Sequence, residues 1–173
     1  MTNRHPKNTQ NGYTLLELLI YVAIIGVLLT GVTVFFGVVA DARLKNQAVA
    51  EVNDQAMAAM DYITQTIRNA TSITAPTATT SGASLTLVVP TGSLSPTVFS
   101  LSGSTLQVKE GAAAAVPLTS NDVQVSNLTF TNLTRSGTSG NVQVTFTINR
   151  TNPNAHNEFD YQKTFTSSAE IGW

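Results

Sequence analysis

The feature that most constrains the fold of this chain is an uncharged, apolar stretch that runs from Leu18 to Ala40. As an α-helix, it would span about 35 Å, compared with about 30 Å for the hydrocarbon core of a bilayer. A helix that is apolar on all sides needs lipid or a large protein core around it, and little in the remaining sequence could cover it. The stretch therefore predicts a membrane-spanning helix.

A single carboxylate, that of Glu17, stands at the start of this stretch. An ionisable side chain at the edge of a membrane segment is unfavourable unless another group compensates its charge, so such residues are usually functional. The alternative is a glutamate that lies at the headgroup boundary without a role. The position of Glu17 favours a functional residue whose partner must be identified.

After Ala40 the apolar residues change from a continuous run to the three- and four-residue spacing of an amphipathic helix. No Pro or Gly occurs between Val38 and Pro76. We therefore expect one helix from about Tyr13 to about Ala70, whose second half packs against a sheet of the same chain. A coiled coil is the alternative, but the stripe is Ala-rich and short for one. The stripe consists of Leu44, Ala48, Val52, Ala56, Ala59, Met60, Ile63, Ile67 and Ala70.

The second half of the chain is rich in Ser, Thr, Gly and β-branched residues and reads as antiparallel strands. Ser102-Gly103-Ser104 predicts one hairpin turn, residues 136–140 predict another, and residues 152–157 predict a further turn. A slip in the alternation between Val125 and Leu128 predicts a β-bulge. Strands are expected at 84–89, 98–101, 105–108, 123–130 and 142–148, with a last one marked by Phe159, Tyr161 and Phe165. The fold class is α+β, with a long N-terminal helix packed on a small antiparallel β-sheet head.

Composition excludes several function classes. The chain has no cysteine, which rules out disulfides, thiolate metal sites and cysteine nucleophiles. The net charge of -1 does not favour a nucleic-acid partner. Lys and Arg flank the apolar stretch equally, so the positive-inside rule does not orient it. The neutral, β-patterned second half resembles an exported domain, which favours an N-terminus inside the cell.

Gly12, followed by Tyr13-Thr-Leu-Leu-Glu17-Leu-Leu, resembles the processing and assembly signal of type IV prepilins and of type II secretion pseudopilins. The resemblance implies a pilin-like fold and a membrane peptidase that cuts between Gly12 and Tyr13 and methylates the new amine of Tyr13. Glu17 would then be the fifth residue of the mature chain. Its assembly role would be shared with its apolar neighbours Leu16, Leu18 and Leu19.

The chain departs from the common pattern at three points, of which the missing Pro and the missing Cys favour a minor pilin or pseudopilin over a major pilin. The first mature residue would be Tyr13 and not the commoner Phe, Val34 stands where many major pilins carry Pro, and no Cys can form a C-terminal disulfide. Residues 125–130, with the polar turn and strand that follow, are similar to minor pilins and J-type pseudopilins.

The resemblance also implies a domain organisation and a set of partners. Residues 1–12 would be the leader, 13–40 the transmembrane and assembly helix, 41–70 its amphipathic continuation and 71–173 the β-rich head. The implied partners are other pilin or pseudopilin subunits, the prepilin peptidase, an inner-membrane assembly platform and membrane lipid. The chain would cross the cytoplasmic membrane once and then enter an extracytoplasmic fibre, serving pilus biogenesis, type II secretion or DNA uptake.

In such a fibre, the N-terminal amine of a neighbouring subunit could approach Glu17 and compensate both charges. The amine of the same chain could instead pair with this carboxylate without any assembly. Both pairings stay open from the sequence.

Enzymatic activity and a cofactor are not expected, because no nucleophile motif frames the scattered Ser, His and Asp residues. Asn154, Glu158 and Asp160 are weak candidates for calcium ligands, since oxygen-rich loops bind this ion. They lack a regular ligand spacing, and a solvated strand face carrying Glu158 and Asp160 is the favoured interpretation.

Two other functions remain open. The chain could be an unprocessed, membrane-anchored β-rich adhesin or binding domain. It could also be a secreted enzyme or binding protein that is released by cleavage near Ala42, where Ala40-Asp41-Ala42 resembles a signal-peptidase site.

Overall fold

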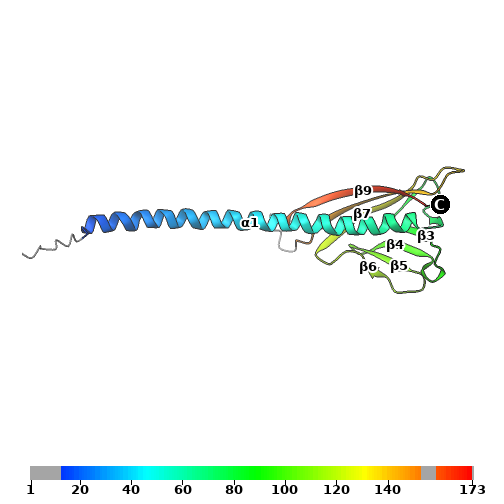
Figure 1. The fold of residues 1–173 in the computed structure, drawn as a ribbon, viewed down its shortest axis with the longest axis horizontal. Helices are drawn as coiled ribbons and strands as arrows, with labels where there is room; N and C mark the ends of the chain where they lie inside the picture. The colour runs from blue at the N-terminus through cyan, green and yellow to red at the C-terminus, as the bar shows by residue number, and fades with distance from the viewer. Residues whose placement is uncertain (1–12, 153–158, 173) are drawn as a thin grey trace, which may run out of the picture. The chain divides into compact units, whose positions relative to one another are not determined.

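A computed structural model describes residues 13–152 and 159–172 of the chain. The chain divides into two compact units, Met1–Asp41 and Ala42–Trp173, which are treated separately below. One helix, α1 (Leu15–Arg68), contributes residues to both units (Figure 1). The predicted helix from about Tyr13 to about Ala70 is confirmed to within two residues at each end.

The N-terminal unit consists, in its described part, of Tyr13, Thr14 and the first half of α1. Thr14 precedes the helix and caps it: its Oγ1 accepts the N–H of Glu17 at 3.2 Å. The side chains from Leu18 to Val38 are exposed throughout. By length and composition α1 could cross a membrane, and the most apolar part of it has no buried residue.

The second unit contains two antiparallel sheets. The five-stranded sheet has the order β1-β3-β4-β5-β6, and the four-stranded sheet has the order β2-β7-β8-β9. A short 3-10 helix, η1 (Gly92–Leu94), lies between β3 and β4. The strands are β1 (Ser72–Ala75), β2 (Ser81–Gly82), β3 (Leu85–Val88), β4 (Thr97–Ser102), β5 (Thr105–Glu110), β6 (Val116–Pro117), β7 (Val123–Asn132), β8 (Asn141–Arg150) and β9 (Gln162–Glu170).

The second half of α1 supplies one wall of the hydrophobic core. In Figure 1 it runs between β7 and β9 on one side and β4, β5 and β6 on the other. Its buried residues join those of both sheets in one cluster, in which Ile63, Phe99 and Phe146 have no exposed surface. The predicted stripe is therefore the buried face of the helix, except for Leu44, whose side chain is 38% exposed.

The α+β class and the long helix on antiparallel strands are confirmed, while details of the sheets differ. The strands form two sheets, and β1, β2 and β6 lie in segments for which the sequence predicted no strand. The predicted bulge is present: the β7–β8 register shifts between Ser126 and Thr129, and Asn127 has a φ of 53°.

The last strand was predicted too early. β9 begins at Gln162, so Phe159 and Tyr161 precede it, while Phe165 lies within it and pairs with Phe146. The reason is physical: β9 lies at the edge of its sheet and is largely exposed, so its sequence shows little apolar alternation. Most of the predicted turn at 152–157 lies outside the described residues.

Candidate functional site

The start of α1 brings the predicted assembly residue into contact with a tyrosine one helical turn later. The hydroxyl of Tyr21 donates a hydrogen bond of 3.1 Å to Glu17 Oε1. Residues four apart lie on the same face of a helix, which places the phenol beside the carboxylate. Glu17 is partly exposed, and Tyr21 is 49% exposed.

The ring of Tyr13 completes this cluster. It meets the ring of Tyr21 edge to face, with centroids 6.4 Å apart and planes at 78°. Edge-to-face packing is a favoured geometry for aromatic pairs. Tyr13, Glu17 and Tyr21 therefore form one cluster, in which the backbone nitrogen of Tyr13 lies at the head of the helix, before the cap Thr14.

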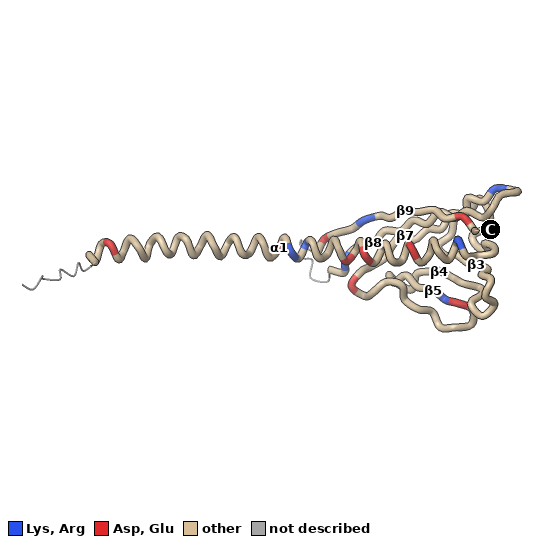
Figure 2. The backbone as a smooth tube through the Cα atoms, in the orientation of Figure 1, with Lys and Arg blue, Asp and Glu red and all other residues tan. Residues whose placement is uncertain are grey.

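Leu16, Leu18 and Leu19, which the sequence linked to assembly, are 69%, 60% and 59% exposed. Large exposed apolar surfaces are unusual for a protein in water and mark sites of contact with membranes or other proteins. Figure 2 shows that an acidic residue near the start of α1 is followed by a long uncharged segment. Gly12, the other half of the predicted cleavage site, lies outside the described residues.

The comparison with protein families decides what this segment is. Residues 7–33 match the family described as the prokaryotic N-terminal methylation motif. The chain is type IV prepilin-like. The matched residues include Gly12, Tyr13, Glu17 and Tyr21, and the motif is that of a structural protein and not of an enzyme family. Neither the curated proteins nor the solved structures that were searched contain a match to this prepilin-like chain.

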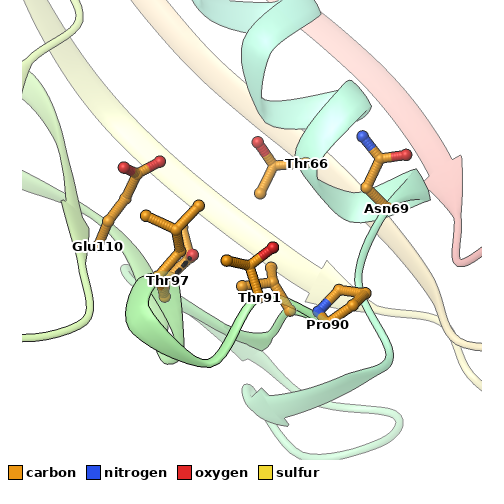
Figure 3. A pocket seen from close by; sticks show the side chains of 8 residues that line it. Thr66, Asn69, Pro90, Thr91, Thr97 and Glu110 are labelled. Carbon is orange, nitrogen blue, oxygen red and sulfur yellow. Dashed lines mark hydrogen bonds between the residues drawn. The ribbon is translucent and has the colours of Figure 1, made fainter.

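A pocket of about 410 Å³ lies in the head between the last turns of α1 and the segment from β3 to β5, with Glu110 in its lining (Figure 3). Glu110 Oε1 accepts the hydroxyl of Tyr62 at 2.8 Å. This hydrogen bond, together with burial and the charge of Glu110, raises the pKa of Tyr62 above 10.0. The lining residues are Thr66, Asn69, Val89, Pro90, Thr91, Leu94, Thr97 and Glu110.

Two of the three threonine hydroxyls that line this pocket donate to backbone carbonyls. Thr97 donates to the carbonyl of Leu94 at 2.8 Å, and Thr66 donates to the carbonyl of Tyr62 at 2.7 Å. In the described contacts, neither of these two hydroxyls donates to a side chain that could act as a base.

The calcium hypothesis gains no support from geometry. Within residues 13–152 and 159–172, no three His, Asp or Glu side chains come together as a metal site would require. Asp160 precedes β9, so the prediction that a strand carries it is wrong; Asn154 and Glu158 lie outside the described part of the chain.

Sequence reasoning identified Glu17 but missed Tyr21. The signal was present in the four-residue spacing between them and in the rarity of polar side chains between Leu18 and Ala40. Tyr21 was counted there only as part of the apolar stretch.

Proposed function

We propose that the chain is a structural subunit, a minor pilin or pseudopilin, of a type IV pilus-like fibre. The observation that carries this proposal is Glu17, which lies at the start of an exposed apolar helix inside the matched methylation motif. Prepilin peptidase would cut between Gly12 and Tyr13 and methylate the amine of Tyr13. The fibre would serve pilus biogenesis, type II secretion or DNA uptake.

Electrostatics supports a role for Glu17 in assembly. Cleavage would create a positive amine on Tyr13, at the helix end where the dipole already disfavours positive charge. A charge in a low-dielectric environment is costly unless it is paired. In a fibre, the carboxylate of one subunit and the amine of its neighbour would compensate each other and fix the register between subunits.

The exposed apolar half of α1 supports the same assembly. Before assembly it would lie in the cytoplasmic membrane, with the N-terminus inside and the head outside. In the fibre it would pack against the equivalent helices of other subunits, delivered by the inner-membrane assembly platform. The two environments are alike in being apolar, so transfer between them exposes little apolar surface to water.

The first experiment is to measure the intact mass and N-terminal residue of the protein from native membranes. A chain that begins with N-methylated Tyr13 supports the proposal. A chain that keeps residues 1–12 in cells with an active peptidase contradicts it and leaves the membrane-anchored adhesin or binding domain. The variant Gly12→Val should block the cut, and Asn11→Ala is the matched control.

Orientation is tested with introduced thiols, because the chain has no cysteine of its own. Ser136→Cys lies in the exposed turn between β7 and β8, and Thr2→Cys lies in the leader. A membrane-impermeant maleimide should label intact spheroplasts of the first variant only. Labelling of Thr2→Cys in uncut protein would reverse the proposed topology.

A further inference from the structure

Tyr21 differs from the other polar side chains of the apolar segment in the group to which its hydroxyl donates. From Leu18 to Ala40, the other side chains able to donate a hydrogen bond are those of Thr30 and Thr33. Both donate to carbonyls of their own helix, Thr30 to Gly26 at 2.9 Å and Thr33 to Leu29 at 2.8 Å. Tyr21 instead directs its hydroxyl at the side chain of Glu17.

A carboxylate in this segment needs such a donor before assembly. A subunit that waits in the membrane has no amine from a second subunit beside Glu17, and an unpaired charge in an apolar environment costs several kcal/mol. A hydrogen bond to a charged group is stronger than one between neutral groups. The phenol of Tyr21 supplies this bond within the chain, and the packing of its ring against Tyr13 limits the positions it can take.

The contact leaves room for a second partner. Tyr21 engages Oε1, whereas an ionised carboxylate has two oxygens and about four acceptor positions. An incoming amine can therefore bind without displacing the phenol.

We propose that Tyr21 is a positioning residue for assembly: its hydroxyl holds the Glu17 carboxylate in the orientation that receives the N-terminal amine of a second subunit. The proposal rests on the proposed function, because it requires that Glu17 binds such an amine. It adds a residue of this chain, outside the Gly12-Tyr13 cleavage site, on which incorporation into a fibre depends.

The test compares variants of the full chain in its native host. For each variant, the amount of processed subunit in sheared fibres is divided by the amount in the membrane. Tyr21→Phe removes only the hydroxyl and should lower this ratio roughly tenfold, as expected for the loss of one hydrogen bond to a charged group. Tyr62→Phe, which removes the hydrogen bond from Tyr62 on α1 to Glu110 on β5, is the matched control and should stay within about twofold of the parent.

A double-mutant cycle separates positioning from general packing. If the hydroxyl acts through the carboxylate, Tyr21→Phe should have no further effect once Glu17→Gln is present. An equal effect of Tyr21→Phe in both backgrounds would overturn the proposal. Parent-level incorporation of the single variant Tyr21→Phe would overturn it as well.

A spectroscopic readout tests the contact itself. The chain has 4 tyrosines, so ring-labelled protein in detergent micelles should give separate NMR signals, of which Tyr21→Phe identifies one. In Glu17→Gln, the chemical shift of Tyr21 should move toward the value of a tyrosine whose hydroxyl makes a weaker hydrogen bond. An unchanged signal would contradict the contact.

Different results would contradict the assembly role of Glu17 and the positioning role of Tyr21. If Glu17→Gln assembles like the parent, the proposed assembly role of Glu17 is itself wrong. If Glu17→Gln fails to assemble while Tyr21→Phe assembles normally, the proposed function stands and the role of Tyr21 is wrong.

Discussion

Tyr62 on α1 donates its hydroxyl to Glu110 at the end of β5 across 2.8 Å, and so links the helix to the five-stranded sheet. The ring of Tyr62 also meets that of Phe99 on β4 edge to face, with centroids 6.1 Å apart. One side chain therefore makes a polar contact at its tip and an apolar contact along its ring. These two contacts can be separated by substitution, because phenylalanine keeps the ring and removes the hydroxyl.

Tyr62→Phe should lower the free energy of unfolding by about 0.5–1 kcal/mol, the net value of an accessible hydrogen bond. It should also change the alkaline limb of the stability profile. The pKa of Tyr62 is raised above 10.0 in the folded chain, chiefly by its hydrogen bond to Glu110. Its contribution is therefore complete below pH 10 and lost as the pH rises through the folded pKa.

The measurement is denaturant unfolding of the full chain in a mild detergent, followed by circular dichroism from pH 7 to pH 11. The parent should lose stability above pH 10 more steeply than Tyr62→Phe. Tyr161→Phe, which removes a hydroxyl elsewhere in the head, is the control and should keep the parent profile. Parallel profiles for all three proteins would contradict the link between Tyr62 and Glu110.

Gln55 joins the buried face of α1 to the loop before β7 by two side-chain hydrogen bonds. Its Nε2 donates to Ser120 Oγ at 2.6 Å, and its Oε1 accepts the N–H of Ser120 at 2.7 Å. Gln55→Ala should cost about 1–2 kcal/mol, because it leaves the partly buried N–H of Ser120 without its partner. Gln65→Ala, at an exposed position of the same helix, should change the unfolding free energy by less than about 0.5 kcal/mol. Equal effects at the two positions would show that Gln55 does not hold the loop.

Local patterns in the sequence were enough to predict α1 but not the assignment of strands to sheets. The stripe from Ala48 to Ala70 is a repeated signal over many residues, and no Pro or Gly interrupts it. β2, by contrast, is the two-residue strand Ser81–Gly82, and it pairs with β7 some 50 positions later in the sequence, with Ser81 opposite Thr131. Such pairing is fixed by contacts between distant segments, which the period of a short segment does not report.

The residues of the candidate site also differ in how well the sequence predicts them. Glu17 could be identified from the sequence because its residue type and its place at the edge of an apolar run are both unusual. Tyr21 was missed, because its aromatic ring fits an apolar run and the direction of its hydroxyl, which links it to Glu17, is visible only in the structure. The spacing of four residues permits this contact but does not require it.

Gly111, in the turn after β5, allows a close approach of two backbone segments. Its φ is +54°, and a Cβ at this position would lie 2.2 Å from the carbonyl oxygen of Ser93. Gly111→Ala should therefore cost more than about 2 kcal/mol, since it adds a backbone clash to the strain of a positive φ. Gly103, with a φ of +61° and open space around it, is the matched control. Gly103→Ala should cost about 1 kcal/mol in the same unfolding measurement, and an equal loss at both positions would exclude the clash.

Ile63 tests whether the second half of α1 is the common core of both sheets. Its side chain has no exposed surface and belongs to the cluster that includes Phe99 of β4 and Phe146 of β8. Ile63→Ala should cost about 2–5 kcal/mol because it removes buried methyl groups and leaves a cavity, and Ile63→Val should cost about 0.5–1.5 kcal/mol. Met57, on the same helix, is 54% exposed, and Met57→Ala should fall within about 0.5 kcal/mol of the parent. Amide hydrogen exchange on the full chain locates the effect: Ile63→Ala should lower protection in β4 and in β8 together, because both strands pack on one helix. Loss of protection in only one of them would show that the two sheets are stabilised independently.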